Sequence, residues 1–593
     1  MVILGINASH TATACLLKDG EVLSCISEER LTRVKNQAGL PFLAIKECLR
    51  IVNLNIKDVD YLVLNFKDPK VHLGFSTFIG DKTKVATSDN LSFSQKFISV
   101  FWHLKEQILV QFPPSKYIFD KLLLVIYKFF VNPQTEEKLL TIIENELHIP
   151  RSKVIKADHH LTHSLAGYYG DPDPKSKSKL IFSLDSWGDG ICATVSIAKN
   201  GKIERVATTP AGASIGDLYG LTTIYLGMKG GEHEYKVMGL APYANQKYSQ
   251  RILDKLSSLL WVNSDLTFSA KIHSSMFHQL LPKLFAYERF DNIAAGIQTL
   301  TENLLCEWVE MAIKKTNIED IICTGGVFMN VKANQRITEL SSVKSIYVFP
   351  SCGDESTALG AAYYGYVTKN QNINTMSVKP LKQLYLGEEF SDKAIKKQID
   401  KSKGKGFKVK FSKNIELEIA SLLAKDKIVA RFAGRMEWGA RALGNRSILA
   451  NPDKLEVLST INDQIKSRDF WMPFAPSILE EDSKKYFINK KNISAPYMMM
   501  TFDATNEGKT KLKAAMHQYD FTLRPQVISK DWNPDYYRLI QEFKKITGIG
   551  AVLNTSFNLH GFPIVNSPGD AILVFLKSGL EYLALGPYLL SKV

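Results

Sequence analysis

Short apolar runs separated by turn residues dominate the N-terminal third of the chain, and their layout occurs twice. The first three runs predict β-strands over residues 2–7, 13–17 and 21–26. Three more predicted strands follow about 180 residues later, over residues 180–185, 192–198 and 202–208. In each set an Asx-Gly pair suited to a type I′ hairpin, Asp19-Gly20 or Asn200-Gly201, joins the last two strands. The repetition indicates a duplicated α/β domain, although hairpins also recur by chance.

Actin, the sugar kinases and the large heat-shock ATPases share a duplicated architecture in which the loop after the first strand of each half faces a common cleft. Here those two loops carry His10 and Asp185. A cleft between similar halves is where a nucleotide would bind. Between the two copies, residues 91–150 are rich in Phe, Trp and Leu and predict a helical insertion. Its aromatic side chains are more often core residues than ligand contacts.

Further along, apolar residues at helical spacing predict an amphipathic helix over residues 291–314. Residues 321–330 then predict a buried strand, a tight turn at Gly325-Gly326 and the start of a helix near Asn330. Glycines allow a ligand to approach the backbone, and the N-terminus of a helix offers N–H groups to phosphate or ribose oxygens. A lone Gly-Gly turn is weak evidence for such a site, and its place in a duplicated fold strengthens it.

A second domain is expected because 593 residues exceed what a single hydrophobic core usually holds. Residues 366–380 are polar and lack periodicity, which places the domain boundary there. The second domain is predicted to begin with a helix near residues 414–427 and a strand over 428–432.

Composition narrows the functional classes. The formal charge of +14 suggests a nucleic-acid partner, but the densest lysine patch, residues 393–413, has few aromatic residues to stack on bases, so a solvated face is favoured. Seven cysteines without a CxxC pair predict reduced core thiols in a cytoplasmic protein. The N-terminus lacks a basic region, so no signal peptide is expected. The most apolar tract, residues 122–131, is too short to span a membrane.

Three histidines lie within five positions at 159–163, and this run is the first candidate site. In a helix capped by Asp158, His159 and His163 would project from the same face and could bind one divalent metal ion. Such an ion also needs a carboxylate, and Asp185 and Asp354 each follow a predicted strand. The alternative interpretation is a helix start whose histidines are solvated or satisfied within the core.

The second candidate site is cationic. The segment 434–447 spaces three arginines with glycines and small residues, which suits binding of phosphate oxygens. Lys466, Arg468 and Arg524 add further cations, and residues 553–558 supply hydroxyl and amide donors. This constellation predicts a pocket for phosphorylated small molecules. Ordinary surface arginines are the alternative.

Taken together, these motifs resemble the O-carbamoyltransferases typified by the nodulation-factor, cephamycin and tobramycin enzymes, over nearly the full length of the chain. The resemblance is carried by residues 5–10, 28–35, the pair His159 and His163, and residues 236–242, 325–327, 353–355, 434–447, 473–476 and 554–558. It implies a duplicated, actin/sugar-kinase-like (Kae1-like) domain over residues 1–375, with the helical insertion at about 91–150. A YrdC-like α/β domain is implied over residues 380–593.

The resemblance also implies a reaction. The second domain would form a carbamoyl adenylate from carbamoyl phosphate and ATP. The first domain, with a divalent metal ion, most often Fe²⁺, would transfer the carbamoyl group to a hydroxyl of a small natural-product acceptor. The implied partners are this acceptor and no nucleic acid or membrane, and a homodimer is left open.

Carried over by position, the implied metal ligands are His159, His163 and Asp354, with Asp185 as a further member. The adenylate would contact Gly325, Gly326 and Asn330, and His10 would act as a base on the acceptor hydroxyl. Carbamoyl phosphate and ATP would be held by Arg441, Arg446, Lys466, Arg524, Ser556 and Asn558.

The sequence departs from the family pattern near the expected acceptor site. Thr11 stands where an acidic residue is expected, and Asn36 where a histidine is frequent. The composition, rich in Lys, Ile and Asn, also differs from the antibiotic enzymes of actinomycetes and leads to the hypothesis of a cyanobacterial toxin or natural-product pathway. Two competing hypotheses are a tRNA-modifying enzyme of the threonylcarbamoyl type and a non-catalytic nucleotide-binding regulator.

Overall fold

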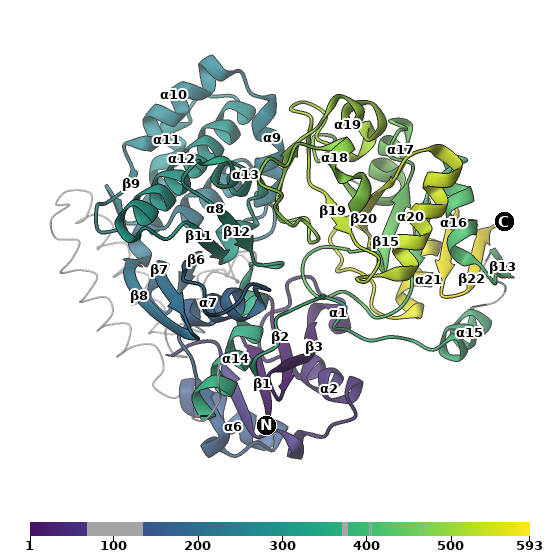
Figure 1. The fold of residues 1–593 in the computed structure, drawn as a ribbon, viewed down its shortest axis with the longest axis horizontal. Coiled ribbons are helices and arrows are strands. Elements are labelled where there is room, and N and C mark those ends of the chain that lie inside the picture. Colours follow the sequence, from purple (N-terminus) through teal and green to yellow (C-terminus); the bar gives the residue numbers. More distant parts are fainter. Residues whose placement is uncertain (68–134, 371–376, 403, 405, 467) are drawn as a thin grey trace, which may run out of the picture.

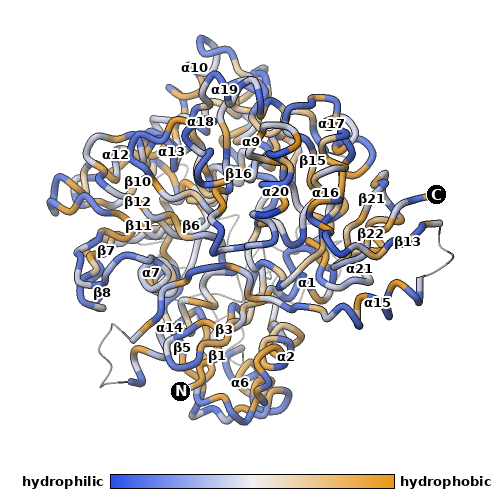
Figure 2. The backbone as a smooth tube through the Cα atoms, turned by 45° about the vertical axis from the view of Figure 1, so that its right-hand side comes forward, coloured by the Kyte–Doolittle hydropathy of each residue, from blue (hydrophilic) through white to orange (hydrophobic). Residues whose placement is uncertain are grey.

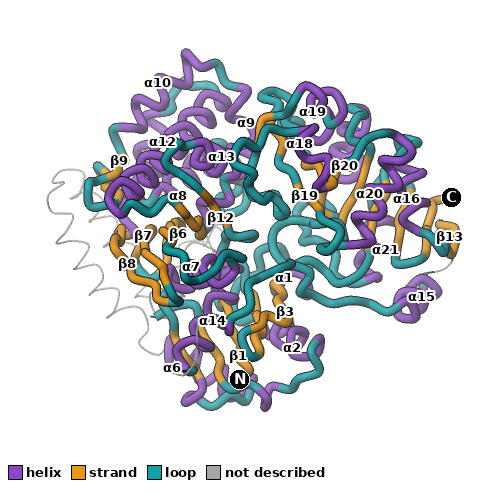
Figure 3. Tube along the Cα trace, in the orientation of Figure 1, coloured by secondary structure: helices purple, strands orange, loops and turns teal. Residues whose placement is uncertain are grey.

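The computed structural model describes residues 1–67, 135–370, 377–402, 404, 406–466 and 468–593, which form two lobes (Figure 1). Most of the predicted insertion at 91–150 lies outside the described residues, and its described part contains helix α6 (Thr135–Leu147). The edges where the lobes face each other consist mainly of loops (Figure 3). Loops therefore supply most side chains at the junction of the lobes.

The first five-stranded sheet has the order β3-β2-β1-β4-β5. Its strands are β1 (Val2–Asn7), β2 (Thr13–Lys18), β3 (Glu21–Ser27), β4 (Tyr61–Leu64) and β5 (Val154–Lys156). β1, β2 and β3 are antiparallel, whereas β4 and β5 run parallel to β1. Asp19 and Gly20 have φ angles of 48° and 83°, the left-handed values that a type I′ turn requires.

The second sheet repeats this arrangement in the order β8-β7-β6-β11-β12. Its strands are β6 (Lys179–Gly188), β7 (Ile191–Lys199), β8 (Lys202–Pro210), β11 (Asp320–Thr324) and β12 (Ser345–Val348). The first three are again antiparallel and the last two parallel to β6. Asn200 and Gly201 repeat the left-handed turn, with φ angles of 50° and 76°. The predicted duplicated α/β, actin/sugar-kinase-like fold is confirmed.

Two helices interlock the halves. Helix α7 (His159–Gly170) follows the last strand of the first sheet but packs on β6 and β11 of the second. Helix α14 (Thr357–Lys369) follows the last strand of the second sheet but packs on β1, β2 and β4 of the first. The helices cross at Gly360, where a Cβ atom would lie only 1.8 Å from the carbonyl oxygen of Thr162. The two helices, and with them the two halves, can therefore approach this closely only because residue 360 has no side chain.

A helical subdomain covers the outer side of the second sheet (Figure 1). Its helices are α8 (Ile215–Tyr225), α9 (Glu234–Leu240), α10 (Gln246–Ser257), α11 (Phe277–Leu284), α12 (Phe290–Thr316) and α13 (Val331–Glu339). α12 contains the amphipathic helix predicted over residues 291–314. Trp308 on its buried face packs between Phe182 and Phe268, with ring centroids 4.9 Å away in each case.

The C-terminal lobe is built on an eight-stranded mixed sheet with the order β13-β22-β21-β14-β15-β20-β16-β19. These strands are β13 (Phe407–Phe411), β14 (Val429–Phe432), β15 (Arg446–Ala450), β16 (Ala475–Leu479), β19 (Gln526–Ile528), β20 (Ala551–Ser556), β21 (Tyr582–Leu585) and β22 (Tyr588–Lys592). Helices α16 (Ile415–Leu423) and α20 (Pro534–Thr547) cover one face, and α21 (Pro568–Lys577) and α15 (Asp392–Lys401) lie over the other. The helix predicted near 414–427 and the strand predicted at 428–432 correspond to α16 and β14.

Smaller elements complete the described chain. They are α1 (Glu29–Thr32), α2 (Phe42–Ile51), β9 (Leu260–Val262), β10 (Phe268–Ala270), α17 (Glu456–Ser459), α18 (Ser483–Tyr486), β17 (Phe502–Asp503), α19 (Asn506–Lys511) and β18 (Thr522–Leu523). A π-helical turn follows α17, at Thr460–Lys466. The segment predicted to hold the domain boundary, 366–380, begins inside α14, which continues to Lys369.

The hydrophobic stretches of the chain follow the strands inside the lobes, as around β1 and β3 in Figure 2. All seven cysteines are buried free thiols, which agrees with the expected reduced core cysteines. Within the described ranges, every helix is too short or too polar to cross a lipid bilayer.

Several contacts between the lobes are made by arginines that donate to backbone carbonyl groups. Arg30 donates to the carbonyl oxygen of Gly439 at 2.6 Å, and Arg33 donates to those of Pro563 and Ile564 at 2.8 and 2.6 Å. In the reverse direction, Arg435 donates to the carbonyl oxygen of Leu23 at 3.1 Å. Because these guanidinium groups are mostly buried, each contact fixes one lobe against the other.

The crossing at Gly360 yields a stability prediction. We expect Gly360→Ala to lower the free energy of unfolding by about 1–3 kcal/mol, because the added methyl group must displace the backbone of α7. Thr368→Ala, on the exposed side of the same helix, is the control and should change stability little. Urea denaturation followed by circular dichroism measures both, and equal midpoints for the two variants would contradict the tight crossing.

Candidate active site

Two imidazoles and two carboxylates converge at the junction of the two halves. His159 and His163 lie on successive turns of α7, Asp185 near the end of β6, and Asp354 at the start of a 3₁₀ turn after β12. The Nε2 atom of His163 lies 3.2 Å from Asp185 Oδ2 and 3.7 Å from Asp354 Oδ1, and His159 Nε2 lies 3.6 Å from Asp354 Oδ1. One potential ligand atom from each residue lies within 4.8 Å of all the others.

Local backbone geometry holds this cluster in place. Asp158 caps α7 by accepting a hydrogen bond from the N–H of Leu161 at 2.8 Å, as the sequence predicts. The ring of His159 packs on Gly188, where a Cβ atom would lie 2.1 Å from the imidazole. On its other nitrogen, Nδ1, His163 shares a hydrogen bond of 3.0 Å with the hydroxyl of Ser356. This contact orients Nε2 toward the carboxylates.

The turn at Gly325-Gly326 positions one carboxylate of this cluster. Gly325 has a φ angle of 95°, and a Cβ atom there would lie 2.3 Å from the carbonyl oxygen of Leu184. The N–H of Gly326 donates to Asp185 Oδ2 at 3.2 Å, and the N–H of Ser186 donates to Oδ1 at 2.6 Å. The turn therefore fixes the carboxylate of Asp185, a role that its sequence does not reveal.

The third histidine of the run, His160, has a different role. Its Nδ1 lies 2.9 Å from Ser183 Oγ and its Nε2 lies 3.1 Å from the carbonyl oxygen of Ile191. Burial lowers its pKa to about 4, so it is neutral. For this residue, the alternative of a core-satisfied histidine is correct.

Electrostatic interactions couple the protonation states of the four clustered groups. Burial opposes a charge on His163, but hydrogen bonds to Asp185 and Asp354 outweigh it and raise the pKa of His163 to about 9. Burial, followed by repulsion from Asp185, raises the pKa of Asp354 to about 7. The carboxylate of Asp185 is also buried, and the hydrogen bond from His163 nevertheless lowers its pKa. A cation is thus favoured between the two carboxylates.

The donor set fits a divalent metal ion. An ion about 2.1 Å from each ligand would separate neighbouring ligand atoms by about 3.0–4.2 Å. The imidazole–carboxylate separations given above, 3.2 to 3.7 Å, fall within this interval. Two imidazoles with carboxylate oxygens are typical ligands of divalent iron and zinc.

His10 lies in the loop after β1, where the charge of Asp185 acts on it. Its side chain keeps access to solvent, and desolvation by the surrounding protein lowers its pKa. The amide of Asn7 donates to the carbonyl oxygen of His10 at 2.7 Å and holds the loop. The two positions that depart from the family pattern, Thr11 and Asn36, both have left-handed backbones, with φ angles of 55° and 53°.

Arg441, Arg468 and Arg524 form a group of cations in the C-terminal lobe. Burial lowers the pKa values of Arg441, Arg468 and Arg524, and repulsion from Arg441 contributes at the other two. The Nε atoms of Arg441 and Arg524 are buried and have no hydrogen-bond partner. Among the described carboxylates, none forms a salt bridge with these arginines. Like charges held together in this way are expected to bind an anion.

Lys466, Ser556 and Asn558 form a second part of this cationic site. The Nζ atom of Lys466 donates to the carbonyl oxygen of Ser556, to its hydroxyl at 3.1 Å and to Oδ1 of Asn558. Burial, followed by repulsion from Arg468, lowers the pKa of Lys466. The structure thus brings together the lysine, hydroxyl and amide that the sequence placed 90 residues apart.

Two residues of the predicted phosphate and adenylate sites are engaged elsewhere. Arg446 is fully buried, stacks 3.6 Å from the ring centroid of Phe432 and donates to the carbonyl oxygens of Ala433, Gly434, Asn445 and Glu388. Asn330 caps α13 through the N–H of Ala333 and exchanges hydrogen bonds with Gln298. Most polar groups of both side chains are thus engaged within the protein, although Nε of Arg446 is buried without a hydrogen-bond partner.

The two sites are connected by a short hydrogen-bonded bridge. The N–H of Ala440, next to Arg441, donates to the hydroxyl of Ser351 at 3.1 Å, and that hydroxyl donates to the carboxylate of Glu355. Glu355 adjoins Asp354 in the chain. The arginine-containing loop and the turn that carries a predicted metal ligand therefore meet at Ser351.

Sequence reasoning missed several of these supporting residues. Ser351, Ser356 and Gly188 act only through contacts made in the folded chain, and their residue types carry no signal. Arg468 was visible as a cation before the rigid segment 472–476, but its membership of the arginine group depends on the fold.

Comparisons with known proteins agree with both lobes. The family model described as Carbamoyltransferase N-terminus matches residues 2–363, and Carbamoyltransferase C-terminus matches residues 420–592. An uncharacterized protein of Methanocaldococcus jannaschii is 31% identical, over 97% of this chain and 96% of that protein. The nodulation protein NolNO of Sinorhizobium fredii is 28% identical, over 98% and 79%, respectively. The 3'-hydroxymethylcephem-O-carbamoyltransferase of Amycolatopsis lactamdurans is 29% identical, over 50% and 53%. The chain therefore belongs to the carbamoyltransferase family.

Proposed function

We propose that this protein is an ATP-dependent O-carbamoyltransferase that acts on a hydroxyl of a small natural product. The observation that carries the proposal is the pair of oppositely charged sites. Uncompensated arginines in the C-terminal lobe suit carbamoyl phosphate and ATP, and an imidazole–carboxylate cluster in the N-terminal lobe suits a divalent metal ion. The family membership supports a transferase.

In the C-terminal lobe, we assign Lys466, Arg441 and Arg524 to binding of phosphate groups. Hydrolysis of carbamoyl phosphate consumes one water molecule and gives carbamate and orthophosphate. The carbamate oxygen then attacks the α-phosphorus of ATP, which forms carbamoyl adenylate and releases pyrophosphate. Charge builds up on the departing phosphate groups, and fixed cations in a water-poor site stabilise it. This role corresponds to that of a YrdC-like domain.

In the N-terminal lobe, we assign His159, His163, Asp185 and Asp354 to a bound divalent metal ion, with Fe²⁺ as the first candidate. The ion would supply Lewis acidity at the carbamoyl carbonyl oxygen. His10, with its lowered pKa, is neutral near pH 7 and takes the proton of the acceptor hydroxyl. The hydroxyl oxygen bonds to the carbamoyl carbon, and AMP leaves.

The acceptor is proposed to be a small hydroxylated molecule rather than a tRNA. The exposed lysines of α15 lie at the outer edge of the C-terminal lobe, away from the junction of the lobes (Figure 1). The relatives include a nodulation protein and the 3'-hydroxymethylcephem-O-carbamoyltransferase. Because ATP and carbamoyl phosphate are cytoplasmic metabolites, we place the reaction in the cytoplasm.

A first prediction concerns the metal ion. We expect the purified protein, loaded anaerobically with Fe²⁺, to bind one ion per chain, and His163→Ala and Asp354→Asn each to weaken this binding at least tenfold, because each removes one ligand. Elemental analysis after gel filtration and calorimetric titration measure the effect. His278→Ala, which removes an exposed histidine of α11, should bind iron like the wild type. Unchanged binding in both ligand variants would refute the assignment.

A second prediction concerns activation of the carbamoyl group. Wild-type protein should release pyrophosphate only when carbamoyl phosphate and ATP are both present, and Lys466→Ala and Arg524→Ala should reduce this release at least a hundredfold. The matched control is Arg538→Ala, since Arg538 is an exposed arginine on α20 that pairs with Glu416 and Asp535. Pyrophosphate formed equally well without carbamoyl phosphate would argue against the proposed reaction.

A further inference from the structure

Half of the formal charge of the chain is concentrated in one short segment that the proposed reaction does not use. Residues 391–413 contain nine lysines and two aspartates, a net charge of +7 out of +14 for the whole chain. The segment includes helix α15 and strand β13, which lie at the outer edge of the C-terminal lobe (Figure 1). A concentration of one sign of charge on one surface attracts a partner of the opposite sign.

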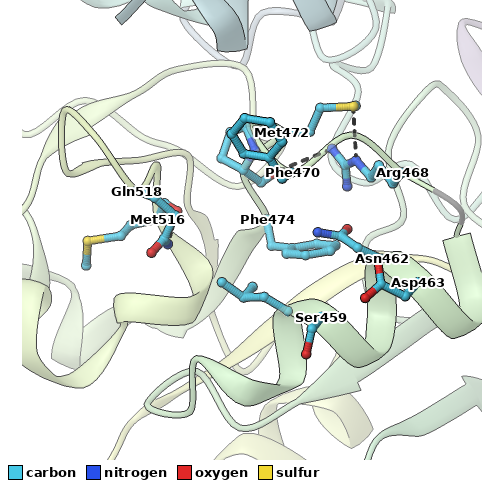
Figure 4. A pocket seen from close by; sticks show the side chains of 11 residues that line it. Ser459, Asn462, Asp463, Arg468, Phe470, Met472, Phe474, Met516 and Gln518 are labelled. Atoms are coloured by element: carbon cyan, nitrogen blue, oxygen red, sulfur yellow. Dashed lines mark hydrogen bonds between the residues drawn. The ribbon is translucent and has the colours of Figure 1, made fainter. Parts of the chain in front are cut away.

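Two cavities of different character lie in the described part of the C-terminal lobe. The pocket of about 300 Å³ lined by Arg468 and Phe474 adjoins the arginine group and belongs to the site described above (Figure 4). A wider groove of about 690 Å³ lies between α15 and Tyr588 of β22. Four lysines of α15 line this groove: Lys393, Lys396, Lys397 and Lys401. The groove is therefore cationic on the side of the helix and has an aromatic ring opposite.

β13 is an edge strand whose outer backbone groups are unpaired. Within the described chain it pairs with β22 alone, at the margin of the eight-stranded sheet. Just past its end, Ser412 donates to the carbonyl oxygen of Pro587 at 2.9 Å, so the backbone groups of the even-numbered residues face β22. Because these groups alternate in direction along a strand, three residues point theirs to the open edge: Phe407, Val409 and Phe411. Such an edge can accept a further strand.

The side chains of β13 alternate between apolar and basic. Lys408 and Lys410 are exposed on the face that α16 covers, where Lys410 pairs with a glutamate of α16 at 2.9 Å. On the opposite face Phe411 is 58% exposed, and its ring centroid lies 5.6 Å from that of Tyr588. Edge lysines commonly protect a sheet against unwanted pairing, but exposed apolar side chains such as Val409 and Phe411 do not. The edge thus combines cations with an apolar strip.

We propose that β13 and the adjoining groove bind an extended acidic segment of a partner protein, which adds to the sheet as a further strand. The backbone of the segment pairs with the open edge, and its alternating side chains contact the lysines and the apolar strip. A second copy of this chain does not fit, because pairing of two β13 edges would bring two lysine-rich segments together. A nucleic acid or an anionic lipid surface would match the charge but leave the strand edge unpaired. This binding does not depend on the proposed reaction, because the edge lies away from both sites.

Fluorescence anisotropy of labelled peptides with the full-length protein tests this assignment. The probe is the blocked heptapeptide Glu-Val-Glu-Val-Glu-Val-Glu, and its uncharged counterpart has Gln in place of each Glu. We expect wild-type protein to bind the acidic peptide about tenfold more tightly than the uncharged one, with a difference that shrinks as salt is added. Equal binding of the two peptides, or no binding of the acidic one, would overturn the proposal.

Two variants separate charge from backbone pairing. Lys393→Glu/Lys397→Glu reverses two exposed lysines of α15 and should weaken binding of the acidic peptide about tenfold. Val409→Pro removes an N–H group that points to the open edge, breaks no bond to β22, and should weaken binding by a similar factor. The matched control, Lys484→Glu/Lys490→Glu, changes the charge of the same lobe equally and should bind the peptide like wild type.

A change in the probe tests backbone pairing without altering the protein. The peptide Glu-Pro-Glu-Pro-Glu-Pro-Glu carries the same charge but lacks half of the N–H groups, so it should bind about tenfold more weakly than the valine peptide. Equal binding of these two acidic peptides would overturn strand addition, and so would an equal loss of binding in the control variant. Tighter binding of an oligothymidylate or of phosphatidylglycerol vesicles than of the acidic peptide would refute a protein segment as the partner.

Discussion

Buried charges of like sign, held close together, are the constraint on which this protein depends. In the C-terminal lobe three arginines and a lysine repel one another in a region that lowers all their pKa values. In the N-terminal lobe two carboxylates share two imidazoles. Desolvated ions cost several kcal/mol each when uncompensated. A bound ligand of opposite charge would relieve this cost.

The scaffold of the N-terminal site is the interlocked pair of helices α7 and α14. α7 and α14 each leave the sheet that precedes them and pack on the other sheet, so the two halves cannot separate without unpacking both. The predicted metal ligands come from α7, from β6 and from the turn before α14. Since these elements meet at the tight crossing near Gly360, their relative positions are set by backbone contact rather than by flexible side chains.

Much of this arrangement could be predicted from local signals. The Asx-Gly hairpins, the capping of α7 by Asp158 and the i, i+4 histidines depend on neighbouring residues, and each was found as predicted. Duplication of the strand pattern indicated the fold, and the order of the motifs along the chain was enough to suggest the family. Prediction is reliable here because each signal is read within one element.

Arg446 and Asn330 show why residue type alone does not define a site. Both have the residue types expected of ligand contacts, yet Arg446 donates to backbone carbonyl oxygens and Asn330 exchanges hydrogen bonds with Gln298. A sequence reveals which groups can form hydrogen bonds, but the availability of each group depends on what surrounds it in three dimensions.

The contacts between the lobes have a consequence for turnover. Arg30, Arg33 and Arg435 donate to carbonyl oxygens, which neither titrate near neutral pH nor attract competing cations as carboxylates do. Ionic strength and proton concentration therefore act weakly on these three contacts, whereas they weaken the ion pairs that also cross between the lobes, such as Lys332 with Asp520 and Lys236 with Asp469. When salt or pH changes, the carbonyl contacts remain and keep the spacing between the arginine group and the imidazole–carboxylate cluster constant.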